Sequence, residues 1–462
     1  MKKTRNSFSG SMGFVLAAAG SAVGLGNIWR FPFLAARDGG GLFLLVYIIL
    51  TVTFGFTLLI TEVAIGRRAA QGPLTAYGYF HKKWKFLGMF SFIVPFIIYP
   101  YYCVIGGWVL NYLTTYATFN AQAPCADGYF GDFISSQWTP IIYMAVFAAA
   151  CLYIVYNGVE KGIERYSRII MPSLVVLVVG ISLYSLTLSY TSESGVTRTG
   201  LQGAAVYLIP NFDGLTLRKF LMVVLDAMGQ LFYSLSIAMG IMVAYGSYMK
   251  KDVNLGKAVD RIEICDTAIA ILAGLMIIPA VYVFMGTEGM SAGPGLMFVT
   301  MPKVFASMHL GTLIGIVFFV LVFFAALTSC ISLYETVVSI LGDRFHMNRR
   351  NSCIVTYIIC IVLGLLSAMG YGTLSGIQPL GMAFLDFFDF ISNSVLMPIV
   401  ALLSCLFLGW VVGIDYIAKE VKKNSSFRRE PMFRVMIRWI APIFLVAILV
   451  SSVLCALGII SI

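Results

Sequence analysis

Charge and histidine are the two things this chain has least of. Only 11% of its 462 residues are charged and 60% are hydrophobic, whereas soluble domains average about 25% charged residues. The three histidines, His81, His309 and His346, stand far apart and form no metal-ligand spacing. Of nine cysteines only Cys125 falls in an expected external loop, which excludes a disulfide framework. We also expect no cleavable signal peptide, and the composition indicates a polytopic membrane protein.

Long apolar segments divide the chain into membrane spans, because a spanning helix needs about 20 apolar residues. Lys and Arg concentrate in one set of the intervening loops, which predicts a cytoplasmic N-terminus and, with an odd number of spans, an external C-terminus. These loops explain the net charge of +10, so no nucleic-acid partner is expected. We expect eleven spans, near residues 11–36, 41–66, 87–118, 139–157, 168–190, 219–248, 262–285, 309–341, 352–370, 380–411 and 436–459.

The first span is interrupted between residues 20 and 32 by three glycines, Asn27, Arg30 and Pro32. Arg alone costs roughly 2.5–3.5 kcal/mol at the centre of a bilayer. We therefore expect the helix to break where it lines a protein cavity. Broken helix ends offer free amides and carbonyls, which suits an anionic group beside a cation.

The sixth span is interrupted in the same way, between residues 229 and 240, by four polar side chains and two glycines. Spans one and six each begin a block of five, and an odd number inverts the second block in the membrane. Matching interruptions in two such halves indicate the central site of a transporter. The glycines of the first span allow two other interpretations. Gly20 and Gly24 could form a small-residue packing face between helices. A phosphate-binding loop is the other, but no strand precedes the glycines and no Lys-Ser/Thr follows them.

Further motifs are Gly39-Gly40-Gly41 at span two, Tyr101-Tyr102 and Gly107-Trp108 in span three, Gly229-Gln230 in span six, and residues 325–329 in span eight. With the first-span motif, the chain resembles the neurotransmitter:sodium symporter family, especially its bacterial amino-acid transporters with eleven spans. The resemblance implies an all-α membrane fold of five-plus-five inverted repeats with broken helices 1 and 6. Its parts would be 1–190 (first repeat), 191–411 (second repeat) and 412–462 (a basic cytoplasmic loop and span 11).

The resemblance also implies a central amino-acid site. The amides of Leu25 and Gly26 with the Tyr102 hydroxyl would hold the carboxylate. Carbonyls of Ala22, Tyr233 and Ser234 would receive the amine. Monoamine carriers of the family have aspartate at the position of Gly24, so glycine favours an amino acid with its own carboxylate. The side-chain pocket would comprise Ser21, Ile98, Ser236, Met239, Ser329 and Leu333, although Met239 and Leu333 alone would also fit ordinary helix packing.

Two sodium sites are implied in the same way. The first resembles Ala22, Asn27, Ser234 and Asp266, and the second resembles Gly20, Val23, Ala325, Thr328 and Ser329. Oxygen ligands of this kind suit hard cations. The family commonly has asparagine at Asp266, and a carboxylate there predicts transport without chloride. The alternatives are an ion pair of Asp266 with a cytoplasmic Lys or Arg, and hydroxyls of Thr328 and Ser329 bonded to their own helix.

The family pattern further implies two gates and a hinge. The outer gate would be Arg30 with Asp389 above Tyr102 and Tyr233, and the inner gate Arg5 with Asp343 near Phe8, Ser247 and Tyr248; Gly162 and Pro172 would form a hinge in span five. The plain alternatives are a static surface pair for Arg5 and Asp343, and a proline-kinked helix start for the hinge. Relatives usually have phenylalanine at the position of Tyr233 and often asparagine at that of Ser21. Because this chain differs at both positions, the resemblance does not identify the substrate.

The function that this resemblance predicts is sodium-coupled import of a hydrophobic or aromatic L-amino acid across the bacterial plasma membrane by alternating access. The alternative is a membrane sensor of amino acids on the same fold. An enzyme is not expected, because no nucleophile–base pair or metal cluster lies within a span. We also expect the external segment 286–308 to fold back as a lid.

Overall fold

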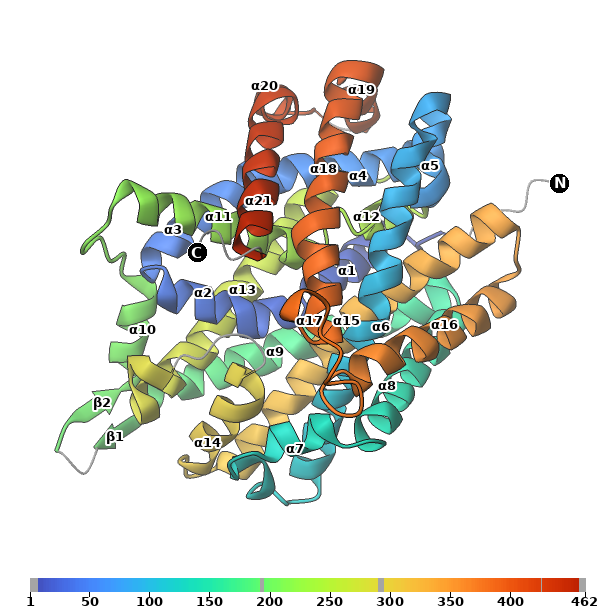
Figure 1. The fold of residues 1–462 in the computed structure, drawn as a ribbon. Coiled ribbons are helices and arrows are strands. Elements are labelled where there is room, and N and C mark those ends of the chain that lie inside the picture. Colours follow the sequence, from blue (N-terminus) through green and yellow to red (C-terminus); the bar gives the residue numbers. More distant parts are fainter. Residues whose placement is uncertain (1–6, 192–194, 290–294, 425, 457–462) are drawn as a thin grey trace.

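The computed structural model describes residues 7–191, 195–289, 295–424 and 426–456 and is almost entirely helical (Figure 1). Its first part comprises α1 (Ser11–Ala22), η1 (Gly26–Arg30), α2 (Phe31–Arg37), α3 (Gly41–Leu50), η2 (Thr51–Gly55), α4 (Phe56–Ala69), α5 (Pro73–Phe80), η3 (Lys82–Trp84), α6 (Lys85–Ala117), η4 (Ala123–Cys125), α7 (Tyr129–Ser135), α8 (Thr139–Tyr156), η5 (Val159–Glu164) and α9 (Arg165–Thr187).

The middle part contains β1 (Ser189–Thr191), β2 (Thr197–Thr199), α10 (Gly200–Leu208), α11 (Leu217–Ser234), α12 (Ile241–Ser247), α13 (Leu255–Met285), η6 (Thr287–Gly289), η7 (Leu296–Thr300), α14 (Met301–Ala306) and α15 (Gly311–Phe345). The last part contains α16 (Arg349–Met369), η8 (Pro379–Gly381), α17 (Phe384–Asp389), η9 (Phe390–Leu396), α18 (Met397–Leu406), η10 (Phe407–Val412), α19 (Asp415–Lys422), α20 (Glu430–Val435), η11 (Met436–Ile440) and α21 (Ala441–Ala456).

Within the described residues, nine continuous helices are long and apolar enough to cross a membrane. A tenth candidate is the pair Ser11–Ala22 and Gly26–Arg37, which bends by 53° at the residues between them. The expected span 219–248 is divided into α11 and α12. Neither half counts as a spanning helix by itself, because α11 has 18 residues but three charged side chains and α12 has only 7 residues. The protein is thus a multi-pass helical membrane protein, and the total of eleven spans stays a prediction.

The break between α11 and α12 holds the backbone in unusual conformations. Ser236 and Ala238 have φ angles of 53° and 63°, and each such non-glycine residue costs about 1–2 kcal/mol. Two buried contacts hold this turn: a Glu62 oxygen accepts the Ala238 amide hydrogen at 2.6 Å, and the Ser236 hydroxyl donates to the Ser21 carbonyl at 3.1 Å. The second contact joins the two interrupted segments to each other.

The long helices α6 and α15 pack along one another through the centre of the molecule (Figure 1). In this view α5 and α19 lie toward the top, whereas α7, α14 and the β1–β2 hairpin lie toward the bottom (Figure 1). The hairpin is antiparallel, with Ser189 opposite Thr199.

The segment expected to act as a lid forms η6, η7 and α14, and its residues 290–294 lie outside the described residues. Phe298 of η7 stacks on Phe130 with ring centres 5.0 Å apart. The same ring makes edge contacts with Trp29 and Trp108. The segment therefore covers aromatic side chains next to the first broken helix.

Candidate cation and substrate site

Asp266 of α13 is the centre of a buried polar cluster next to both helix breaks. Its side chain is fully buried and accepts a hydrogen bond from the Asn27 amide at 2.8 Å. The Ser234 hydroxyl lies 2.8 and 2.9 Å from the two carboxylate oxygens. The structure thus brings Asn27, Ser234 and Asp266 together from three helices. Tyr47 of α3, which the sequence did not single out, donates to the other side of the carboxylate at 3.2 Å.

Every hydrogen-bond partner of Asp266 is neutral. Among the residues that the structure describes, no Lys or Arg forms an ion pair with it, so the ion-pair alternative does not hold there. A buried carboxylate without a counter-charge is costly, and a bound cation would remove that cost. Carboxylate, amide and hydroxyl oxygens suit a hard cation such as Na⁺. The adjacent end of α1 at Ala22 adds backbone carbonyls that have no partner within the helix.

At the second predicted sodium site the side-chain oxygens are hydroxyls bonded to backbone carbonyls, in contrast to the carboxylate of the first site. The Thr328 hydroxyl donates within its own helix, to the carbonyls of Phe324 and Ala325 at 3.0 and 3.1 Å. The Ser329 hydroxyl donates across to the Ser21 carbonyl at 3.0 Å. A Cβ atom added to Gly20 would lie 3.3 Å from the Thr328 Cβ, so the two elements do face each other. The bonds at Thr328 match the plain helix-bonding alternative, and those at Ser329 do not.

The side chains predicted to surround the substrate line one cavity, which has a volume of about 20 Å³. The lining comprises Ser21, Ala22, Gly24, Ile98, Tyr102, Tyr233, Ser236, Met239, Ile241, Ser329 and Leu333. Ile241 is the one member that the sequence did not single out. Such a cavity holds about one water molecule, so an amino acid would enter only after side chains move.

Two glycines explain the shape of this cavity. A Cβ atom on Gly24 would lie 2.6 Å from the Ser329 hydroxyl and 3.2 Å from that of Tyr102, so any side chain there would fill the cavity. A Cβ on Gly26 would lie 2.2 Å from Cδ1 of Tyr233, whose ring rests on this glycine. The Leu25 amide donates to the Tyr102 hydroxyl at 3.4 Å, so two of the groups predicted for a carboxylate converge.

The two residues of the predicted outer gate are not in direct contact. Asp389 accepts hydrogen bonds from the Tyr101 hydroxyl at 3.1 Å and the Asn393 amide at 2.5 Å. Arg30 lies close enough for a Coulombic interaction with Asp389, but within the described chain no ion pair joins them. Neither Tyr101, named only as part of a motif, nor Asn393 was predicted as a partner of Asp389. Asn393 is four residues away in the same helical segment, whereas nothing in one sequence says that the distant Tyr101 meets Asp389.

The predicted inner gate is described only in part, since Arg5 lies outside the described residues. Phe8 is buried and makes edge contacts with Tyr245 and Tyr248. Asp343 accepts the Gly72 amide hydrogen at 2.6 Å. The Ser247 hydroxyl donates to the Ala244 carbonyl at 2.5 Å. Of the predicted members, Tyr248 is therefore in contact with Phe8, whereas Asp343 and Ser247 bond other groups.

The predicted hinge lies where the N-terminal segment attaches to span five. Gly162 is in η5, and a Cβ there would lie 2.1 Å from the Ile154 carbonyl oxygen; Pro172 lies inside α9. The nearby Glu164, which the sequence analysis missed, accepts the Ser9 amide hydrogen at 2.8 Å. An acidic residue at the start of an apolar span is the signal that could have indicated this contact.

Acidic residues are also buried inside three other apolar helices. They are Glu62 in α4, Glu335 in α15 and Asp266 in α13. The Glu335 carboxylate accepts from Tyr248 at 2.7 Å and pairs with Arg349 at 2.6 Å. Ionisable groups are rare inside spans and mark functional or structural contacts. Only Asp266 among the three was predicted, since the resemblance alone carried that prediction.

The fold is that of a polytopic helical membrane protein, in which interrupted helices meet beside a buried acidic cluster and a small cavity. The model of the sodium:neurotransmitter symporter family matches residues 5–135 and 132–457. The chain belongs to this family, and it is accordingly a sodium-dependent membrane transporter and not an enzyme.

Relatives and a solved structure agree with this assignment. The uncharacterized sodium-dependent transporter YhdH of Bacillus subtilis is 33% identical over 96% of this chain and 97% of its own length. A sodium- and chloride-dependent GABA transporter 2 of Rattus norvegicus is 25% identical over 93% of this chain and 77% of its own. The crystal structure of MhsT in complex with L-phenylalanine superposes with a TM-score of 0.85 and 35% identity, covering 97% of this chain and all of that chain.

Proposed function

We propose that this protein imports a hydrophobic or aromatic L-amino acid together with sodium, by alternating access and without a need for chloride. The observation that carries the proposal is the buried Asp266 carboxylate with neutral partners at 2.8–3.2 Å, next to both helix breaks. That MhsT was crystallised with L-phenylalanine supports the substrate class. The proposed sodium ligands are the two sets predicted from the sequence.

The cavity combines polar and apolar lining groups. The Leu25 amide bonds the Tyr102 hydroxyl, and the helix dipole there favours the substrate carboxylate. Ile98, Met239 and Leu333 are apolar members of the lining. Met is flexible and packs well against aromatic rings, so the pocket can enlarge for a large apolar side chain. Gly24 leaves space for a substrate that brings its own carboxylate.

Chloride independence follows from the charge of Asp266. A fixed carboxylate supplies the negative charge that a bound chloride would otherwise add beside the first sodium. Sodium coupling is also sufficient in energy. Each charge moved down 100 mV yields about 2.3 kcal/mol, and a tenfold gradient adds about 1.4 kcal/mol. Two sodium ions would thus supply about 7 kcal/mol, enough for roughly 10⁵-fold accumulation of a zwitterion.

The membrane arrangement that we propose is that of the bacterial plasma membrane with the N-terminus in the cytoplasm and the C-terminus outside. The two blocks 1–190 and 191–411 would be inverted repeats that rock about the central site. Arg30 and Asp389 would approach one another when the outer side closes, and Phe8 would move when the inner side opens.

The proposal is tested by a thermal-shift screen of the purified protein with twenty amino acids, in sodium gluconate and in potassium gluconate. Leu, Ile, Met, Phe, Tyr or Trp should stabilise the protein in sodium only, and Asp, Glu and Lys should not. A strongest response to an acidic or basic amino acid would overturn the pocket assignment. Counterflow in proteoliposomes then separates a carrier, which exchanges labelled substrate, from a sensor, which binds without exchange.

A further inference from the structure

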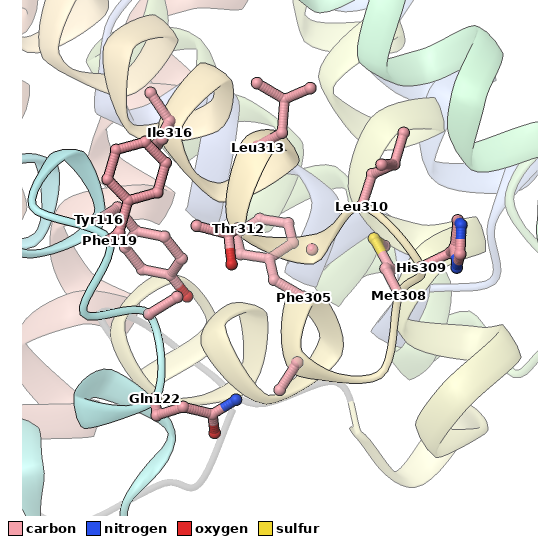
Figure 2. Close-up of a pocket in the computed structure, with 13 residues that line it drawn as sticks. Tyr116, Phe119, Gln122, Phe305, Met308, His309, Leu310, Thr312, Leu313 and Ile316 are labelled. Atoms are coloured by element: carbon pink, nitrogen blue, oxygen red, sulfur yellow. The ribbon is translucent and has the colours of Figure 1, made fainter.

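A second cavity lies far along the molecule from the central site. It has a volume of about 520 Å³ and opens between the end of α6, the segment that follows it, the end of α14 and the start of α15 (Figure 2). This size falls within the range of small-molecule sites, about 300–1,000 Å³. Its lining comprises Tyr116, Phe119, Ala121, Gln122, Phe305, Ala306, Met308, His309, Leu310, Gly311, Thr312, Leu313 and Ile316.

The lining combines apolar surface with hydrogen-bond donors. None of these thirteen residues, all in the described part of the chain, is Asp, Glu, Lys or Arg. The polar groups are the Tyr116 and Thr312 hydroxyls, the Gln122 amide and the His309 ring, and each of them can donate a hydrogen bond. The lining therefore favours a ligand with hydrogen-bond acceptors at one end and hydrocarbon at the other.

The Tyr116 hydroxyl is a buried polar group for which the described residues supply no hydrogen-bond partner. The side chain of this residue is only 1% exposed. Figure 2 shows this hydroxyl directed toward the segment that carries Gln122. Buried hydroxyls are nearly always hydrogen-bonded, so this donor calls for an acceptor from a bound molecule or water.

Phe119, at the rim of the cavity, offers an exposed apolar side chain to a ligand. The end of α6 turns back at this residue, where the Phe119 amide bonds the Tyr116 carbonyl and the Asn120 amide bonds the Thr115 carbonyl. Glycine is the usual residue at such a turn. Phe119 adopts the left-handed conformation, with φ at 58°, and leaves its ring 79% exposed. A large exposed ring on a strained backbone suits contact with a hydrocarbon group.

The depth of the cavity identifies the class of ligand. Thr312 and Thr328 lie on the continuous helix α15, and they are about 24 Å apart along it at 1.5 Å per residue. Thr328 lies at the level of the helix breaks, near the middle of the bilayer, and the hydrocarbon core extends only about 15 Å to either side. Thr312 is therefore at headgroup level. Leu310 and Leu313, 49% and 54% exposed, lie beside it.

We propose that this cavity binds one phospholipid of the outer leaflet. Its phosphate and ester oxygens would accept hydrogen bonds from the polar lining groups of Tyr116, Gln122, Thr312 and His309. An acyl chain would run along Leu313 and Ile316. The uncharged lining accommodates a zwitterionic headgroup without requiring an anionic one. The headgroup depth rests on helix breaks at the middle of the bilayer and the choice of leaflet on the proposed topology, whereas sodium coupling plays no part in this inference.

The test is native mass spectrometry of the full-length protein, delipidated in detergent and titrated with dihexanoylphosphatidylcholine below its micelle concentration. Thr312→Phe fills the cavity and should reduce the bound lipid at least about tenfold. Gln122→Ala, a milder change in an exposed loop, should reduce it about threefold, the effect of one hydrogen bond. Val176→Phe is the matched control, because it adds the same ring to a position of α9 that is 70% exposed, and it should bind like the wild type.

Two further probes distinguish the source of the ligand. Glycerophosphocholine, which is the headgroup alone, and hexanol, which is a chain alone, should each bind much more weakly than the whole lipid. Equal lipid binding by the wild type and both cavity variants would overturn the proposal, as would glycerophosphocholine binding as tightly as the lipid. Sodium-driven uptake is measured in parallel with the wild type, so that a failure of the proposed transport function is recorded separately.

Discussion

The two proposed sodium sites flank the same broken helix but are organised in opposite ways. At the first, a fully buried carboxylate collects donors from three other elements, at 2.8–3.2 Å. At the second, the Thr328 hydroxyl is bonded within its own helix. The first site therefore has its charge in place before any cation arrives, whereas the second must exchange internal hydrogen bonds for the ion. We expect the first site to bind sodium more tightly and to depend on charge, and the second to depend on geometry.

The largest effect should come from Asp266→Asn, which keeps the shape and removes the charge. Removing one member of a buried ionic contact costs about 3–5 kcal/mol, so the sodium concentration for half-maximal substrate binding should rise at least 100-fold. The measurement is a sodium titration of labelled amino-acid binding to purified protein. Asp127→Asn, at a carboxylate whose side chain is 92% exposed, is the control. An unchanged titration for Asp266→Asn would remove the first site from the account.

Ser234→Ala should have the next largest effect, because it removes a hydroxyl that contacts both carboxylate oxygens. A hydrogen bond to a charged group contributes about 1.5–3 kcal/mol, so apparent sodium affinity should fall about tenfold or more. Ser182→Ala is a matched control, since this buried hydroxyl bonds only the carbonyls of Val178 and Leu272. Equal losses in the two variants would mean that Ser234 acts through stability alone.

Thr328→Val sharpens the comparison at the second site. If the Thr328 hydroxyl only bonds its own helix, Thr328→Val should lower the apparent sodium affinity no more than Thr336→Val does. Thr336 is the matched control, since it donates to the Ser332 carbonyl at 2.8 Å in the same helix. If Thr328 is a sodium ligand, Thr328→Val should lower sodium affinity about tenfold, the effect of one lost polar contact of about 1.4 kcal/mol. We expect this tenfold loss, and recovery of the affinity in Thr328→Ser. Sodium titrations of both valine variants decide between these outcomes.

The smallest effect should come from Tyr47→Phe. Its hydroxyl makes the longest of the contacts to Asp266, at 3.2 Å, and Asn27 and Ser234 remain. We expect a loss of about 0.5–1 kcal/mol, or two- to fivefold in sodium affinity. The check is the same titration together with a melting temperature. A loss as large as that of Asp266→Asn would show that Tyr47 is a principal determinant of the site.

Sequence alone predicted the class of fold because a membrane allows few solutions: polar and glycine-rich interruptions in apolar spans can only line a cavity. The meeting of Asn27, Ser234 and Asp266 depended on the resemblance to a family, since Asn27 is more than 200 positions from the other two residues. The contribution of Tyr47 could not be predicted, because its helix is apolar on several sides and nothing in the pattern indicates the direction of its hydroxyl.

The size of the cavity and the distance between the gate residues could not be predicted from the sequence. The predicted pocket residues do meet, but the space between them is only about 20 Å³. The positions that side chains such as Tyr233 adopt in one conformation cannot be read from a list of residues. Likewise, Arg30 and Asp389 were predicted as a pair, whereas Asp389 bonds Tyr101 and Asn393. A gate pair forms in some states of a transporter only, so sequence can name its members without fixing their distance.

The most direct test of the central claim is equilibrium binding of radioactive sodium to the purified wild-type protein and to Asp266→Asn, with saturating substrate and with chloride replaced by gluconate. The account predicts two ions per wild-type molecule and the loss of one of them in the variant. The same stoichiometry and affinity in both proteins would contradict it.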